Sequence, residues 1–365
     1  MAGLLLSVLA LSLLTAASAR QQGPLIPQSP CISPGTFGPG TNSPRDYSFT
    51  LRHVFQRGTT VFPGLHRRLD VQKKEDKQGK YSDHDGFGTP GPFPVRVASH
   101  AIQRLANRRV EDALRSLDAT QDYGTSPFLS STAWTSDVVL GPNITDKDTV
   151  LNLALMAANA YDADRSDPDW VDVGQGFNSS ISFGWENDGL RGHVFADVTN
   201  STIVISVKGT TAVVFDGADT TTNDKENDNL FGSCCCGEGG QYLWRQVCQC
   251  KTSVYTCNQT CLTKSLRKPN RYYQASLELY GNITELYPAS DVILVGHSLG
   301  GVIVSLLGLT FGVPTVTFEA YGQALAAKRL GLPLPPNSHV STSQAGAHTG
   351  GYHFGHTAGK TTWSH

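Results

Sequence analysis

Residues 291–301 read DVILVGHSLGG, a short apolar run that ends in the pattern Gly-x-Ser-x-Gly. The β-branched run is typical of a buried parallel strand, and the apolar residues that follow it from Val302 favour a helix. A turn of Gly296, Ser298 and Gly300 between a strand and a helix lifts a serine hydroxyl above the edge of a sheet. The stretch therefore predicts a nucleophile at Ser298; the alternative is a glycine-rich structural turn.

The composition describes a polar-surfaced protein long enough for one large domain with extensions. The chain has 365 residues, of which 39% are hydrophobic and 16% charged. The net charge of −2 gives no electrostatic reason to expect a nucleic-acid partner. The 37 glycines and 19 prolines indicate many turns and long connections.

The first 19 residues, MAGLLLSVLALSLLTAASA, are uncharged and apolar. They fit a cleaved signal peptide or an uncleaved signal anchor, and either would place the rest of the chain in the secretory lumen. Five Asn-x-Ser/Thr acceptors for N-glycosylation agree with that location, at Asn143, Asn178, Asn200, Asn258 and Asn282.

The cysteines also point to an oxidising compartment. Seven of the eight fall within residues 233–262, at Cys234, Cys235, Cys236, Cys248, Cys250, Cys257 and Cys261. We expect a disulfide-rich insertion there; a zinc cluster is the alternative, although the spacing fits no usual finger. Cys31 makes the number even, and the pairing cannot be deduced from the sequence.

Residues 20–140 predict an N-terminal lumenal extension that is rich in Pro, Gly and Arg and weakly periodic. Within it, residues 51–71 predict an extended element around a turn. Residues 100–117 have apolar side chains at helical spacing, so we expect a helix. Its basic face would meet either an anionic membrane or water.

From residue 141 the pattern is that of a compact core. We expect helices over 148–163 and 271–288, a strand pair over 192–210, a polar loop over 217–229 and a buried strand over 313–320. This alternation predicts an α/β fold with a mostly parallel sheet.

Ester hydrolysis by a serine needs a base, an acid that orients the base, and donors for the oxyanion. The backbone N–H of Leu299 at the helix N-terminus is one natural donor. Thr210, after the strand TIVISV, is a second candidate, unless it is only a turn threonine. Glu319 is the only acidic residue after Ser298, so it is the possible substitute acid, with a later histidine as base.

Five segments together carry a family resemblance: VKGT (207–210), DNLFGSCCCGEGGQYLWRQVC (228–248), GHSLGG (296–301), GVPTVTFEA (312–320) and GYHFGHTA (351–358). They resemble the fungal autophagic-body lipases, the autophagy-related members of the class 3 lipases. The resemblance implies an α/β-hydrolase-type, class 3 lipase-like domain over residues 141–358, with the Cys-rich insertion inside it. It places the family's nucleophile on Ser298 and its oxyanion threonine on Thr210.

The resemblance further implies a lipase or phospholipase that needs no metal or organic cofactor. Its partners would be membrane lipids, including phosphoinositides, and its oligomeric state stays open. It implies a glycosylated, single-pass type II protein of Golgi and endosomal or multivesicular-body membranes. That protein would reach the vacuole and break down the membranes of autophagic bodies.

The sequence departs from the family after Ala358. The family continues with Asp-Pro, whose Asp is the triad acid, whereas Gly359 stands here, and the family's catalytic His would lie downstream. We interpret residues 359–365 as an unrelated tail, such as read-through into an intron, and expect the chain as written to be nearly inactive. The alternatives are a catalytically dead lumenal lipid-binding pseudo-lipase and a secreted carboxylesterase.

Overall fold

The computed structural model describes residues 11–15, 45–70, 94–123, 134–161, 188–211, 220–232, 247–253 and 256–332. The strands are β1 (Leu11–Thr15), β2 (Arg45–Arg57), β3 (His66–Asp70), β4 (Pro94–Leu105), β5 (Trp134–Pro142), β6 (Leu190–Asp197), β7 (Thr202–Val207), β8 (Lys251–Ser253), β9 (Thr256–Cys257), β10 (Asp291–His297) and β11 (Pro314–Phe318). The helices are α1 (Val110–Tyr123), α2 (Lys147–Asn159), α3 (Thr221–Gly232), α4 (Gln259–Leu266), α5 (Tyr272–Leu286), α6 (Leu299–Phe311) and α7 (Ala324–Leu330).

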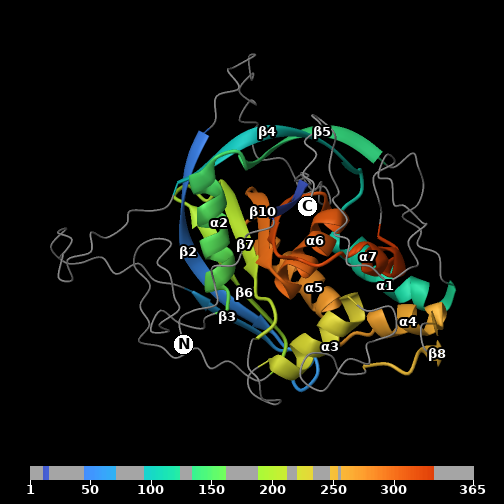
Figure 1. Cartoon of the computed structure of the whole chain (residues 1–365). Coiled ribbons are helices and arrows are strands. Elements are labelled where there is room, and N and C mark those ends of the chain that lie inside the picture. Colours follow the sequence, from blue (N-terminus) through green and yellow to red (C-terminus); the bar gives the residue numbers. More distant parts are fainter. Residues whose placement is uncertain are drawn as a thin grey trace, which may run out of the picture.

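One large mixed sheet organises these elements, in the order β1-β11-β10-β7-β6-β2-β4-β5, with β3 paired to β2 (Figure 1). The predicted α/β class is confirmed. The expectation of a mostly parallel sheet is wrong, because β7, β10 and β11 are the strands that run parallel and the other described pairs are antiparallel. Helical crossovers that allow parallel pairing occur only in the second half of the described chain, where α5 leads into β10 and α6 into β11.

Alternate residues of the central strands belong to two separate hydrophobic cores, one on each face of the sheet. On β10, Val292 and Leu294 lie in the core with α5 and α6, whereas Ile293 and Val295 lie in the core with α2. This alternation is the two-residue period of a strand that is buried on both faces. In Figure 1, α2 and α6 accordingly lie on opposite sides of the central strands.

The strand register defines one edge of the sheet that matters for function. Phe55 of β2 pairs with Gly192 of β6, which pairs with Val207 of β7, which pairs with Gly296 of β10. Just beyond this row, β2, β7 and β10 end and β6 begins. We call this the elbow edge.

The strands before residue 140 belong to the same sheet as those after it. β2 and β3 form the expected extended element around a turn, and β2 pairs along its length with β6. Residues 20–140 therefore contribute to the main sheet, and the exact domain boundary stays a prediction.

The helix expected over residues 100–117 is wrong in its first half. His100–Leu105 is the end of strand β4, paired with β5 from Val97 to Leu105, and helix α1 begins only at Val110. Ile102 and Leu105, which lie in the expected helix, are buried in this paired strand.

The polar loop expected over residues 217–229 is also wrong, because Thr221–Gly232 is helix α3. Asn223, Asp224, Asn227 and Asn229 are all buried in it. The side chains of Asn223, Asp224 and Asn227 find polar partners on other elements, which compensates for the lost hydration.

The expected leader contains strand β1, which pairs antiparallel with β11 in the uncleaved chain. Within the described residues, no helix has the length and apolar character needed to cross a membrane. The signal anchor or signal peptide stays a prediction.

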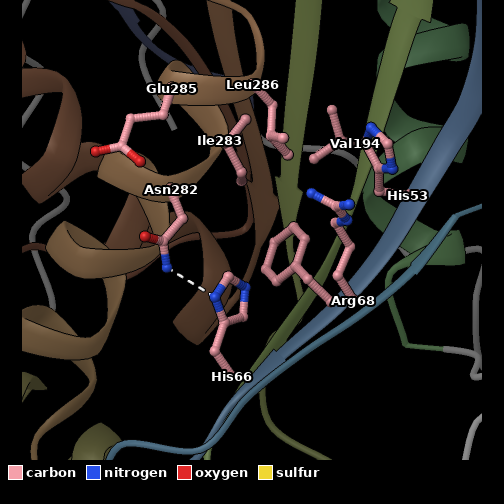
Figure 2. Close-up of a pocket in the computed structure, with 9 residues that line it drawn as sticks. His53, His66, Arg68, Val194, Asn282, Ile283, Glu285 and Leu286 are labelled. Atoms are coloured by element: carbon pink, nitrogen blue, oxygen red, sulfur yellow. Dashed lines mark hydrogen bonds between the residues drawn. The ribbon is translucent and has the colours of Figure 1, made fainter.

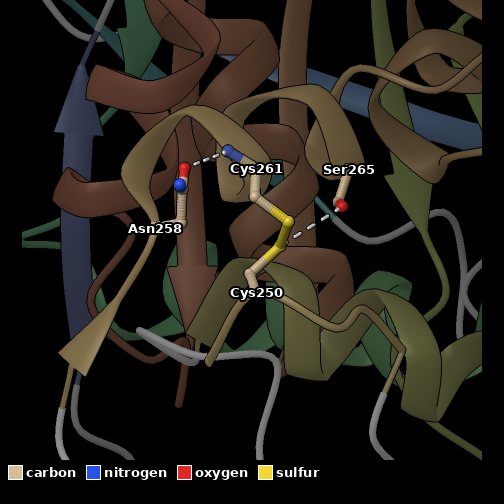
Figure 3. The surroundings of a disulfide bond; sticks show 4 residues. All are labelled: Cys250, Asn258, Cys261 and Ser265. Atoms are coloured by element: carbon tan, nitrogen blue, oxygen red, sulfur yellow. Dashed lines mark hydrogen bonds between the residues drawn. A yellow bond between two sulfur atoms is a disulfide. The ribbon is translucent and has the colours of Figure 1, made fainter. Parts of the chain in front are cut away.

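The Cys-rich insertion contains a disulfide between Cys250 and Cys261, which ties the segment before β8 to the first turn of α4 (Figure 3). Cys248 and Cys257 are disulfide-bonded as well. Asn258 caps α4 by accepting a hydrogen bond from the N–H of Cys261 at 2.9 Å. The disulfide-rich character is thus confirmed for the described part; Cys31 and Cys234–Cys236 lie outside it.

Removing this bridge should destabilise the chain, because the bridge closes a loop with a sequence separation of 11 residues. The double variant Cys250→Ala/Cys261→Ala should lose about 3 kcal/mol of unfolding free energy by loop-closure entropy. Denaturant unfolding without reductant measures the loss. An unchanged midpoint would show that the bridge constrains nothing.

Candidate functional site

Ser298 occupies the sharp turn between β10 and α6. Its backbone angles are φ 53° and ψ −125°, an uncommon conformation for a residue other than glycine. A Cβ on Gly296 would lie 2.5 Å from the Gly300 carbonyl carbon, and one on Gly300 would lie 2.1 Å from the Val207 oxygen. Only glycine therefore fits on either side, and the expected strand–turn–helix geometry around the half-buried Ser298 is confirmed.

The two expected oxyanion donors lie next to this turn. Leu299 is the first residue of α6, where backbone N–H groups lack helical partners. Thr210 follows β7 in a loop that touches the elbow, since a Cβ on Gly209 would lie 2.5 Å from the His297 carbonyl oxygen. The structure thus brings Ser298, Leu299 and the Thr210 loop to one edge.

Thr210 is held by a carboxylate that the sequence analysis did not single out. The Thr210 hydroxyl donates a hydrogen bond to Asp228 of α3, and Tyr321 donates a second one to the same carboxylate at 3.0 Å. Burial raises the pKa of Asp228 to about 6, and the two hydrogen bonds offset only part of this effect. The signal for Asp228 in the sequence is the polar stretch over residues 217–229, which contains it.

A buried ion pair fixes α3 over the same loop. Lys208 Nζ lies 2.9 Å from Asp224 Oδ2, and the two side chains are 4% and 3% exposed. Asp224 also accepts from the N–H of Thr211 at 2.9 Å and from the Tyr272 hydroxyl at 2.7 Å. The pair therefore connects the end of β7, α3 and α5.

Glu319 lies near the elbow but contacts a different histidine from those expected. It follows β11 with a left-handed φ of 50°, and its carboxylate lies 3.4 Å from Nε2 of His297. Nδ1 of His297 lies 2.7 Å from the Tyr161 hydroxyl. The histidines after residue 332 lie outside the described residues, so the substitute triad through Glu319 stays a prediction.

A cavity of about 420 Å³ lies between the β2–β3 hairpin and the last turns of α5 (Figure 2). Phe55, Val194 and Ile283 form its apolar lining. Asn282 and His66 are joined across it by a hydrogen bond of 2.7 Å. Ser298, Leu299 and Thr210 are not among the residues that line this cavity.

Four of the five expected glycosylation acceptors lie in the described residues, and all four reach the surface. Asn143 and Asn258 each use the side-chain oxygen to accept a backbone N–H, which leaves the amide nitrogen for a sugar. Asn200 is exposed in the β6–β7 turn, and Asn282 donates to His66. Their modification stays a prediction, and Asn178 lies outside the described residues.

No family model matches the chain, but curated relatives do. A protein of Passalora fulva is 53% identical over 314 residues, which cover 85% of this chain and 47% of that protein. A protein of Penicillium rubens (strain ATCC 28089 / DSM 1075 / NRRL 1951 / Wisconsin 54-1255) is 47% identical over 361 residues, which cover 97% of this chain and 53% of that protein. Both bear the name "Putative lipase ATG15". The chain spans about half the length of these relatives.

Solved structures give only a weak likeness. The Lip2 lipase from Yarrowia lipolytica is 17% identical with a TM-score of 0.22, over 45% of this chain and 54% of that one. The nonglycosylated LIP2 lipase of the same organism is 18% identical with a TM-score of 0.24, over 54% of this chain and 70% of that one. Scores this low carry no argument, so the fold assignment depends on the geometry described above.

The raised pKa of Asp228 predicts a pH-dependent stability. The native state keeps the proton up to about pH 6, whereas the unfolded chain loses it near pH 4. The unfolding free energy should therefore fall by about 3 kcal/mol as the pH rises through this window. Denaturant titrations of the wild type and Asp228→Asn at pH 4, 5, 6 and 7 isolate the contribution. Parallel pH profiles for the two proteins would contradict it.

Proposed function

Because the chain belongs to the autophagy-related lipase family over most of its length, we propose that it hydrolyses lipid esters with Ser298 as the nucleophile. The observation that carries the proposal is the strained turn at Ser298, flanked by glycines that no larger residue could replace. Strain of this kind is typical of positions where a reactive side chain must be presented.

The reaction would proceed in two steps through an acyl-enzyme. The Ser298 oxygen attacks the ester carbonyl carbon, its proton passes to a base, and the alcohol leaves after receiving a proton. Water then attacks the acyl-enzyme, and the free acid departs. Each step develops a negative oxygen, which needs donors already oriented in the resting protein.

Leu299 and Thr210 are the donors that we propose for this oxygen. The N–H of Leu299 is at the positive end of α6, and the side chain of Ser298 does not cap it. Asp228 accepts a hydrogen bond from the Thr210 hydroxyl, so this side chain cannot rotate freely. The hydroxyl hydrogen is used in this bond, and the group left to donate to a substrate oxygen at the elbow edge is the Thr210 N–H.

The base and the acid are the open part of the mechanism. Among the described residues, the Ser298 hydroxyl has no hydrogen-bond partner, and Glu319 faces His297. We propose that the acid and base follow the family's Asp-and-His pattern, with Glu319 as a substitute acid only if that pattern is missing. A lumenal lipid-binding pseudo-lipase is the second candidate, and Gly359 at the position of the family's triad Asp favours it.

The finer assignment follows from the family alone. We propose acylglycerols or phospholipids as substrates, lysis of autophagic and multivesicular-body membranes in the vacuole as the role, and phosphoinositides among the lipids bound. The proposed route is a type II anchor in Golgi and endosomal membranes. A secreted carboxylesterase would instead leave the cell with a cleaved N-terminus.

A serine-directed fluorophosphonate separates the enzyme from the pseudo-lipase. A form of the chain with an acid and a base in place should be labelled and its Ser298→Ala variant should not, whereas Ser290→Ala, in the loop before β10, should be labelled like that form. Intact-protein mass spectrometry reads the adduct. Absence of labelling in the folded wild type would favour the pseudo-lipase.

Thr210→Val should lower kcat for ester hydrolysis at least about tenfold, since the hydrogen bond to Asp228 that holds the Thr210 N–H in place is lost while the side-chain volume is kept. Thr210→Ser retains the hydroxyl and should stay within a few-fold of wild type. The rates are compared on a form of the protein that turns over a soluble ester. Equal rates for Thr210→Val and wild type would remove Thr210 from the oxyanion site.

A further inference from the structure

The β2–β3 hairpin ends in an exposed apolar tip. We call residues 59–64, TTVFPG, the hairpin tip. Val61 is 62% and Phe62 is 42% exposed. Elsewhere among the described residues the large exposed apolar side chains are isolated along the chain, at Val138, Leu151, Val198, Leu286 and Leu325. Isolated exposed apolar residues are normal, but a neighbouring pair at the end of a hairpin needs an explanation.

A buried carboxylate holds this tip in shape. Asp188 is fully buried and accepts hydrogen bonds from four consecutive backbone N–H groups, those of Thr59, Thr60, Val61 and Phe62, at 2.9–3.0 Å. Burial by itself raises the pKa of Asp188, but these donors outweigh it and hold the pKa below its usual value. The Val61 and Phe62 side chains take no part in these bonds and are held outward.

The tip projects from the same edge of the sheet as Ser298. Phe55 and Gly296 lie in one row of paired residues, with the tip beginning shortly after Phe55 and Ser298 two residues after Gly296. Three strand spacings separate β2 from β10, which is about 14 Å. Asn223 of α3 also donates to Asp188 at 2.6 Å, so the tip is joined to the helix that holds Thr210. In Figure 1 the blue hairpin accordingly reaches the yellow α3 at the bottom of the view.

The stem of the hairpin is cationic. Residues 45–70 contain five arginines, two aspartates and no lysine or glutamate, a formal charge of +3 in a chain whose total is −2. Of these arginines, Arg57 is paired with Glu278 of α5, so the charge next to the tip comes from β3. Arg68 is exposed close to the tip, beside exposed His66, and is paired with Asp70. An apolar tip on a cationic stem matches the surface of an anionic bilayer, whose phosphates lie above its acyl chains.

We propose that the hairpin tip docks the protein on anionic phospholipid bilayers. Val61 and Phe62 enter the acyl region, Arg67 and Arg68 of β3 contact lipid phosphates, and the elbow edge with Ser298 faces the membrane. The proposal deepens the proposed function, since it explains how a lipid ester reaches the serine, but binding is measured without turnover.

Vesicle flotation of the 365-residue chain tests the docking. The protein carries Ser298→Ala so that the vesicles stay intact, and the vesicles are phosphatidylcholine with or without phosphatidylserine. Val61→Ser/Phe62→Ser should weaken binding to the anionic vesicles at least about tenfold. The matched control is Val198→Ser, which removes a 70% exposed valine from the turn at the opposite edge and should bind like the parent.

Binding of the parent should also be weaker on pure phosphatidylcholine and should fall with added salt. Because the tip is held by backbone bonds, the double variant should keep the thermal midpoint of the parent. Equal binding by the double variant and the parent, equal losses in the double variant and Val198→Ser, or no binding by the parent would each overturn the proposal. Fluorophosphonate labelling of Ser298 in the wild type is independent of all three outcomes, so docking can fail while the proposed chemistry stands.

Discussion

The buried ion pair of Lys208 and Asp224 is the interaction on which the elbow edge depends. Helix α3 is too polar to be held by apolar burial alone. The ion pair compensates part of the cost of burying its polar inner face. Breaking one partner of such a pair leaves an uncompensated buried charge, at a cost of about 3–5 kcal/mol. Asp228 reaches Thr210, and Asn223 reaches Asp188, only because α3 lies where this pair puts it.

The pKa values of two further carboxylates on this edge are shifted in opposite directions. Asp188 receives four backbone N–H groups and has a lowered pKa, whereas Asp228 receives two hydroxyls beside the charge of Asp224 and has a raised one. The difference is the number and kind of donors, since both side chains are largely withdrawn from water. The carboxylate with the lowered pKa supports the hairpin tip, and the carboxylate with the raised pKa touches the candidate oxyanion residue.

The elements that the sequence predicted correctly are those whose conformation depends on neighbouring residues. The strand and turn at Ser298, helices α2 and α5 and the β6–β7 pair depend on neighbouring residues, whose spacing is visible in the chain. Helix α3 was missed because its polar face is satisfied by partners as far away as Tyr272, 48 residues on from Asp224. Strand β4 was missed because its pairing with β5 outweighs the helical spacing of its apolar residues. Asp188 carries no local signal and Asp228 only the polarity of its segment, since their roles arise from loops brought together by the fold.

The bonds at Asp188 fix how long the loop from Gly58 to Leu65 can be, but they leave its outward side chains free. Four consecutive N–H groups must point at one carboxylate, so adding or deleting a single residue would turn the N–H groups that follow it away from Asp188. Exchanging Val61 or Phe62 leaves that arrangement untouched. The loop is therefore a position where new recognition sequences of the same length could be grafted without redesigning the scaffold.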